Sequence, residues 1–146
     1  MPERETLERA KEDAREGKSP STQAGEFVRE EIHHVREGKH GARSPQQAIA
    51  IGLSKARRAG VKLSAPKGRA SVRKKAEQDE RAAEKGSAHK TSVTRSRAVE
   101  GALQRESRSA ASHDALSRQA KRSAAKRGKT SRKKAAAKAA RTRKAA

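Results

Sequence analysis

The stretch SPQQAIAIGLSKARRAG, residues 44–60, carries the clearest signals for local structure in this chain. Ser44 is a residue type that caps helix N-termini, Pro45 suits the first helical position, and Gln47 stands where a capping box has its second member. Apolar residues then recur at the spacing of one helical face. Gly60 can end the helix in the left-handed conformation. This stretch therefore predicts a helix.

Two more helices are predicted before it. Residues 22–37 repeat an apolar face and are followed by Gly38, while residues 3–16 form a charged helix with few apolar residues. We expect Glu26, Glu30 and Glu31 to make the outer face of the helix over 22–37 acidic. The short connections between the three segments suit antiparallel helices.

The large apolar residues of these helices are too few for a stable monomer of this size. We therefore expect their apolar faces to be completed by a partner or by a second copy of the chain, giving a homo-oligomer through helices 22–37 and 44–59. The residues expected on this association face are Phe27, Val28, Ile32, Val35, Ile49 and Leu53.

The charge is divided unevenly along the 146 residues, whose formal net charge is +21. Residues 1–60 hold 12 basic and 10 acidic residues, whereas residues 61–146 hold 26 basic and 7 acidic ones. Only five of the large apolar residues lie beyond residue 64. High net charge with few large aliphatic residues is typical of chains that do not bury a core.

The sequence thus predicts a mainly α protein with a small N-terminal helical unit of two to three helices over residues 1–64. A linker over 64–70 leads into a basic, low-complexity region over 65–146, which we expect to be largely disordered and transiently helical. Its segments 71–85, 92–111 and 112–127 have high helix propensity, but isolated helices of this length are marginal in water. The strongly cationic tail, 115–146, has 13 basic residues and no acidic one.

Cations at this density bind phosphates and release the counterions of nucleic acid. The residues expected to contact phosphates are Lys67, Arg69, Arg73, Lys74, Lys75, Arg118, Lys121, Arg122, Lys126, Arg127, Lys129, Arg132, Lys133, Lys134, Lys138, Arg141, Arg143 and Lys144. Arg57 and Arg58, with Lys55, are interpreted instead as surface residues that stabilise the end of their helix.

Other classes of function find little support. There is no cysteine and no nucleophile motif, and a small, weakly cored chain does not build a rigid catalytic site, so we expect no enzyme and no cofactor. His33, His34 and His40 match no metal-ligand spacing and are interpreted as solvated surface residues, so no metal site is expected. Membrane binding is disfavoured because the tail has no bulky apolar face.

The segments GKSPSTQAGEFVREEI (17–32) and SPQQAIAIGLSKARRAGV (44–61) resemble a family of small basic bacterial proteins of unknown function, over about residues 5–64. The Lys/Ala-rich end of the chain resembles the tails of linker histones and of bacterial histone-like proteins. The family resemblance implies a bacterial cytoplasmic or nucleoid setting and supplies no site residues.

We therefore expect a nucleoid-associated, histone-like protein that binds nucleic acid nonspecifically, double-stranded DNA above all. The alternative is a protein-interaction adaptor in which the helical unit binds a partner or itself and the tail only brings it to nucleic acid or ribosomes.

Overall fold

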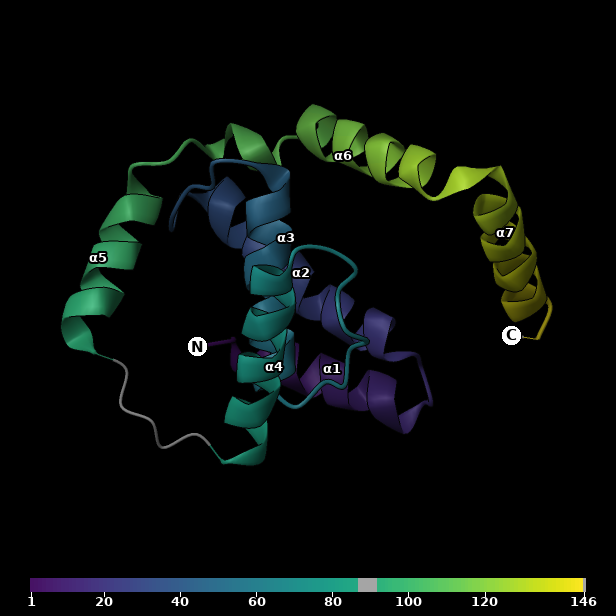
Figure 1. The fold of residues 1–146 in the computed structure, drawn as a ribbon, viewed down its shortest axis with the longest axis horizontal. Helices are drawn as coiled ribbons and strands as arrows, with labels where there is room; N and C mark the ends of the chain where they lie inside the picture. Colours follow the sequence, from purple (N-terminus) through teal and green to yellow (C-terminus); the bar gives the residue numbers. More distant parts are fainter. Residues whose placement is uncertain (87–91, 146) are drawn as a thin grey trace. The chain divides into compact units, whose positions relative to one another are not determined.

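The computed structural model describes residues 1–86 and 92–145. They form α1 (Arg4–Arg15), α2 (Pro20–Glu37), α3 (Pro45–Arg58), α4 (Ala70–Glu84), α5 (Val93–Gln104), the short 3-10 helix η1 (Arg108–Ala111), α6 (His113–Lys126) and α7 (Gly128–Ala145) (Figure 1). This part of the chain contains no strand, so the mainly α prediction is confirmed. Its contacts divide it into unit 1, Met1–Ala111, and unit 2, Ser112–Ala146.

The boundaries of α2 and α3 in unit 1 follow one repeated pattern. The Ser19 side chain accepts a hydrogen bond from the Thr22 N–H and caps α2, and Pro20 takes the first position, so this helix begins two residues before the predicted start. Ser44 caps α3 in the same way, as predicted. Gly38, with φ of 80°, ends α2 in the left-handed conformation. Local sequence signals are therefore sufficient to place these ends.

The core of unit 1 lies among α1, α2 and α3, around the single aromatic residue. Phe27 is 1% exposed and packs with small residues of α1, of α2 itself, of α3 and of the segment after α3. The buried ones are Ala10, Ala24, Ala56 and Val61. Helices α2 and α3 approach closely at Gly52, where an added Cβ would lie 2.7 Å from Cα of Val28. Small residues thus let a chain with few large side chains close a core by bringing helix backbones together.

Helix α4 also packs within unit 1, although it lies beyond the predicted N-terminal helical unit. Asp79 is 2% exposed and accepts hydrogen bonds from Ser54 at 2.5 Å and Arg58 at 2.8 Å, both on α3. Ala76, one turn earlier, is 5% exposed. A buried carboxylate is retained only when donors satisfy it, and α3 supplies two of them. The compact unit consequently continues past residue 64.

Residues 103–111 close unit 1 against the loop after α2. The Gly41 N–H donates to the Leu103 carbonyl at 2.8 Å, and the Ala42 N–H donates to the Ser107 carbonyl at 3.0 Å. The loop passes so close to the backbone of Glu106 that a Cβ on Gly41 would collide with it. Arg36 donates to the Ala111 carbonyl at 2.9 Å. These bonds join segments that are far apart in the sequence.

The prediction that residues 65–146 are largely disordered is wrong, because the described part of this region is mostly helical. Helix α4 has a partner in α3, and α6 is capped by Ser112, whose hydroxyl accepts from the Ala115 N–H at 3.2 Å. Alanine, lysine and arginine are also among the best helix formers. Helices α5 and α6 nevertheless bury none of their residues, as the scarcity of large apolar side chains predicts.

Candidate functional site

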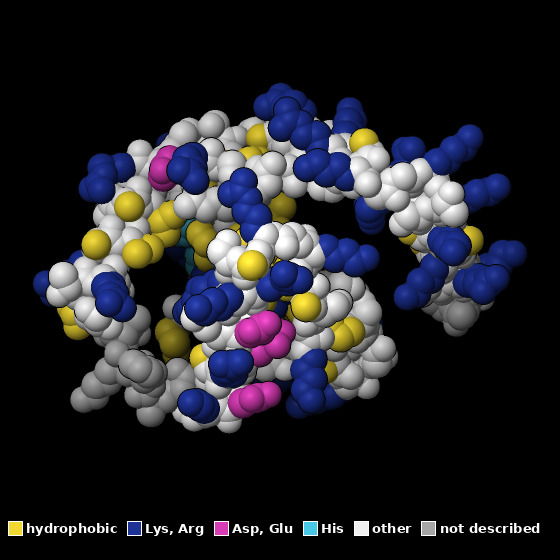
Figure 2. Space-filling view, in the orientation of Figure 1, with side chains coloured by type: hydrophobic (Ala, Val, Ile, Leu, Met, Phe, Trp, Pro, Cys, Tyr) yellow, Lys and Arg dark blue, Asp and Glu magenta, His cyan; other side chains and the backbone are white. Residues whose placement is uncertain are grey.

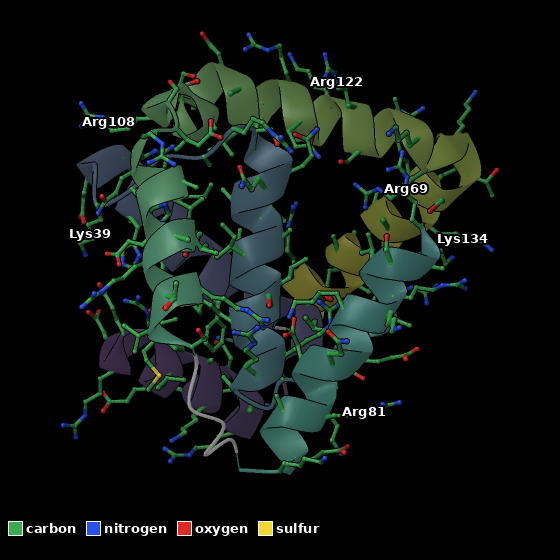
Figure 3. The ribbon with its side chains drawn as sticks, turned by 60° about the vertical axis from the view of Figure 1, so that its left-hand side comes forward. Lys39, Arg69, Arg81, Arg108, Arg122 and Lys134 are labelled. Atoms are coloured by element: carbon green, nitrogen blue, oxygen red, sulfur yellow. The ribbon has the colours of Figure 1, made fainter. Side chains whose placement is uncertain are left out.

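Unit 2 presents a set of lysine and arginine side chains that we call the basic surface. All of its thirteen members are exposed, and among the described residues none is in an ion pair. Arg122 and Lys134 project outward from their helices, and further cations follow along both α6 and α7 (Figures 2 and 3). The basic surface comprises Arg118, Lys121, Arg122, Lys126, Arg127, Lys129, Arg132, Lys133, Lys134, Lys138, Arg141, Arg143 and Lys144.

The spacing of these cations differs between the two helices. In α6, Arg118, Lys121 and Arg122 are three and four residues apart and share one face of the helix. In α7 the cations surround the helix, since one row begins at Lys129 and a second at Lys134. Helix α6 is thus basic on one side, whereas α7 is basic all round.

The predicted phosphate-binding cluster at 67–75 is divided by the structure. Lys75 lies 3.1 Å from the Asp79 carboxylate, so its charge is partly engaged within α4. The other members, Lys67, Arg69, Arg73 and Lys74, are exposed, and no ion pair involves them in the described chain. All five cations are exposed, and four of them are in no ion pair within the described chain.

The interpretation of the basic residues at the end of α3 as surface residues is wrong for two of the three. Lys55 lies 3.0 Å from Glu30 and 2.7 Å from Glu31, both on α2. Arg57 is 8% exposed. Arg58 remains exposed but binds Asp79 of α4. These cations hold α2 and α4 against α3.

The expected association face is largely covered within the chain. Phe27, Ile32 and Val35 are buried. Val28, Ile49 and Leu53 are half-buried, and Leu53 packs against the core. The apolar faces of α2 and α3 thus meet each other, and self-association stays a prediction.

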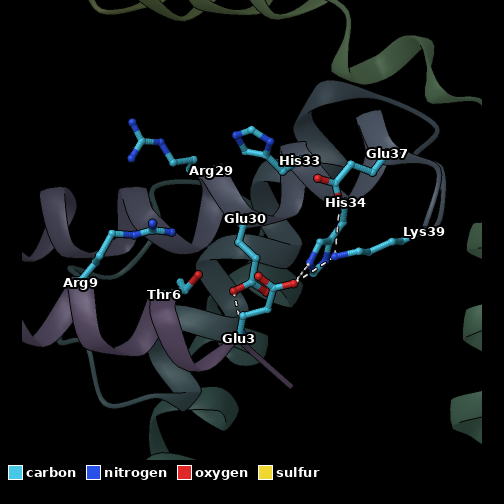
Figure 4. Close-up of a pocket in the computed structure, with 9 residues that line it drawn as sticks. All are labelled: Glu3, Thr6, Arg9, Arg29, Glu30, His33, His34, Glu37 and Lys39. Atoms are coloured by element: carbon cyan, nitrogen blue, oxygen red, sulfur yellow. Dashed lines mark hydrogen bonds and ion pairs between the residues drawn. The ribbon is translucent and has the colours of Figure 1, made fainter.

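A cavity of about 330 Å³ opens beside α1 and α2 (Figure 4). Glu3 accepts hydrogen bonds from Lys39 at 3.0 Å and pairs with His34 at 2.9 Å at its edge. The bonds to His34 and then to Lys39 lower the pKa of the Glu3 carboxyl to about 2, and the bond to Glu3 raises the pKa of Lys39. The residues lining it are Glu3, Thr6, Arg9, Arg29, Glu30, His33, His34, Glu37 and Lys39.

Two carboxylates of α2 lie buried where an acidic outer face was predicted, and one of them, Glu30, lines this cavity. Glu30 is 4% and Glu31 1% exposed, so that prediction is wrong for both. Burial alone would raise the pKa of Glu30, but the N–H of Glu3 and the ammonium of Lys55 lower it. Burial would likewise lower the pKa of Lys55, and its bonds to Glu31 and Glu30 raise it instead. The two carboxylates and the ammonium of Lys55 thus form one cluster of ion pairs.

The prediction of solvated histidines is also wrong for two of the three. The side chain of His34 is 13% exposed and that of His40 16%, whereas His33 is exposed. One ligand atom from each of Glu31, His34 and His40 lies within 4.8 Å of the other two. Sequence spacing missed this group because His40 reaches it from a loop, and only the turn at Gly38 brings that loop back to α2.

The burial of Glu31 had a signal in the sequence. Phe27, Glu31 and Val35 recur every fourth residue and so share the buried face of α2. An ionisable residue within an apolar stripe indicates a buried charge with partners, and these partners are Lys55 and His40.

The comparisons with known proteins bear on α2 and α3 and on the connection to α4. No curated protein and no solved structure matches the chain. In the described residues, no helix is both long and apolar enough to cross a membrane. Residues 17–69 match the model of a family of unknown function (DUF6496), in agreement with the resemblance to an uncharacterised family.

Proposed function

We propose that the protein binds nucleic acid, duplex DNA in particular, through phosphate contacts of its basic surface and without sequence preference. One observation carries the proposal: the thirteen cations of the basic surface are exposed and form no ion pair within the described residues. Unit 2 contains only one acidic residue, Asp114, to compete with phosphates for them. Such a surface attracts a polyanion and gains free energy from the release of its counterions.

The charge spacing of α7 supports the same partner. An α-helix of 18 residues is about 27 Å long, and α7 carries eight cations over this length, or one per roughly 3.4 Å. In duplex DNA the phosphates of each strand recur at about the same interval along the helix axis. Because the cations surround α7, the helix can meet phosphates on both walls of a groove.

The chain has no exposed aromatic side chain on which unpaired bases could stack. Phe27 is the only aromatic residue of the chain, and it is buried in the core of unit 1. Proteins that bind single strands stack bases on exposed aromatic side chains. The proposed binding therefore rests on phosphates, which supports a DNA-coating role at the bacterial nucleoid.

The experiment compares two full-length variants with the same net charge. In the first, Lys129, Arg132, Lys133 and Lys134 of α7 are changed to Gln, which retains helix propensity. In the control, the exposed cations Lys11, Arg15, Arg43 and Lys62 of unit 1 are changed to Gln. Fluorescence anisotropy of a labelled random duplex is measured for both and for the wild type across a range of salt concentrations.

We expect the α7 variant to flatten the plot of log affinity against log salt by about 0.9 for each phosphate that the variant no longer neutralises, or by roughly 3–4 in total. The control variant should keep a slope close to that of the wild type. Equal flattening in both would show that only net charge matters, and an unchanged slope in the α7 variant would reject the basic surface as the binding site. Vesicles of anionic lipid, added as competitor, should displace the duplex only weakly.

A further inference from the structure

Glu31, His34 and His40 converge at the end of α2, in unit 1 and apart from the basic surface. Glu31 and His34 are three residues apart and lie on one face of the helix, and His40 follows in the loop after Gly38. Nε2 of His40 is 3.0 Å from Oε1 of Glu31. The rings of His34 and His40 meet edge to face, with centroids 6.0 Å apart.

The contacts of His40 bring its Nε2 against a carboxylate oxygen of Glu31. Nδ1 of His40 lies 3.0 Å from the Gly41 carbonyl oxygen, which only accepts, so Nδ1 carries a proton. A neutral ring then has a lone pair on Nε2, pointing at a carboxylate oxygen that also only accepts. Such a contact at 3.0 Å is repulsive unless a proton or a metal ion lies between the two atoms.

The charge balance around this point also favours a cation. Glu30 and Glu31 bring two buried negative charges, and Lys55 is the one lysine or arginine within ion-pair distance of them in the described chain. Lys55 lies against Oε2 of Glu31, which leaves Oε1 on the side of His40. Two buried carboxyl groups thus share one lysine, and Oε1 of Glu31 has no lysine or arginine beside it in the described chain.

We propose that Glu31, His34 and His40 bind one divalent transition-metal ion, with zinc as the best fit. Two imidazoles and one carboxylate are a known zinc ligand set, which leaves a fourth position to water or another ligand. The mutual separation of up to 4.8 Å exceeds the roughly 3.4 Å between ligands of tetrahedral zinc. The proposal requires side-chain rotations that close this difference of about 1.4 Å, and Nε2 of His34 must leave Glu3 if it is the ligand atom.

The metal would act on unit 1 as a clamp. His40 precedes Gly41 and Ala42, whose N–H groups hold Leu103 and Ser107. A bond from His40 to an ion on α2 fixes the start of this loop, and with it the surface on which residues 103–111 pack. Metal binding therefore stabilises the packing of this loop against residues 103–111.

The test uses full-length protein that has been freed of metal with a chelator. Zn²⁺ is titrated in competition with a chromophoric chelator, and Co²⁺ is titrated in parallel because its visible absorption reports four-coordinate geometry. The test variants are His34→Gln and His40→Gln, which leave the Glu31–Lys55 pair in place. The matched control is His33→Gln, an exposed histidine beside His34 on the same helix.

The wild type and His33→Gln should each bind one equivalent of Zn²⁺, and their unfolding temperature should rise on binding. Loss of one ligand should weaken binding by more than about 100-fold, the upper end of the effect of a mere supporting residue. The proposal is overturned if the wild type takes up no Zn²⁺, if His33→Gln loses as much affinity as His34→Gln, or if both test variants keep the full equivalent. Circular dichroism of each variant without metal establishes that it is folded.

Discussion

Units 1 and 2 use the same basic residues in opposite ways. In unit 1, cations such as Lys55 and Arg58 lie against carboxylates of other helices and hold the helices together. In unit 2, the thirteen cations have only Asp114 as an acidic neighbour in the sequence and remain exposed. The role of a lysine or arginine in this protein is therefore decided by the acidic residues that the fold brings near it.

The units also differ in what stabilises their helices. Unit 1 buries Phe27, Val35 and a set of alanines, so its helices support one another. Helix α6 buries no residue, and it depends on its Ser112 cap and on intrinsic propensity. Substitutions at matched positions in the two units should therefore have very different effects.

The largest effect is expected at the core of unit 1. Replacing Phe27 by Ala removes the only aromatic side chain and should cost about 3–5 kcal/mol of unfolding free energy. Urea unfolding followed by far-ultraviolet circular dichroism measures this loss. If the alanine variant does not fold, Phe27→Leu serves in its place, with an expected loss of about 1 kcal/mol. Leu116→Ala in α6 should change the free energy little. A similar loss for both would show that unit 2 has a core of its own.

The second largest effect is expected at Asp79, the buried carboxylate that joins α4 to α3. Asp79→Asn removes the charge to which Ser54, Arg58 and Lys75 are bound, and should destabilise unit 1 by about 2–3 kcal/mol. Asp114→Asn, in the exposed first turn of α6, should cost no more than about 0.5 kcal/mol. The same unfolding measurement compares the two. Equal stability of Asp79→Asn and the wild type would mean that α4 is not held by this carboxylate.

The two units should also differ in how their stability responds to acid. Burial would raise the pKa of Asp79, but its bonds to Ser54, Arg58 and Lys75 lower it, and the pKa of Glu30 is also lowered. The contribution of these two carboxylates to the stability of unit 1 is complete at a pH above their ordinary pKa values of 3.8 and 4.5. It is lost as the pH falls through their lowered pKa values. Because the pKa of Lys55 is raised, its contribution to stability is complete below pH 10.5 and is lost only as the pH rises through the raised value.

We therefore expect the urea midpoint of unit 1 to be level near neutral pH and to fall below about pH 4. Asp79→Asn should lose part of this dependence. The helix content of α6 and α7 should change little over the same range, because Asp114 is the only carboxylic side chain in unit 2. A midpoint that stays constant down to pH 2 would contradict the proposed pairing.

The smallest effect concerns single cations. Arg132→Gln should reduce the salt slope of DNA binding by about 0.9 and leave the unfolding free energy unchanged. Arg58→Gln should do the reverse, since Arg58 is bound to Asp79 at 2.8 Å. Fluorescence anisotropy measures DNA binding, and urea unfolding measures stability, for both variants. A loss of DNA affinity in Arg58→Gln equal to that in Arg132→Gln would remove the distinction between paired and unpaired cations.

The sequence by itself determined where α3 begins and ends. Ser44, Pro45 and Gly60 act within one turn of the residues they control, so the predicted limits of α3 agree with the structure. The same holds for the charge of unit 2, which depends on composition alone. The sequence did not show that residues 65–146 are mostly helical. Helix propensity alone does not include the stability that alanine-rich helices gain from caps and from packing against neighbours.

Only the tertiary structure decided which polar residues became functional candidates. Glu31, His34 and His40 meet because Gly38 reverses the chain, and Asp79 meets Ser54 across 25 residues of sequence. Local patterns report only neighbours within a turn or two, whereas a buried charge is stable only beside partners that packing delivers from elsewhere. The sequence therefore determined the helices and the charge of this protein, and the packing of the helices decided which charges stay free for a partner.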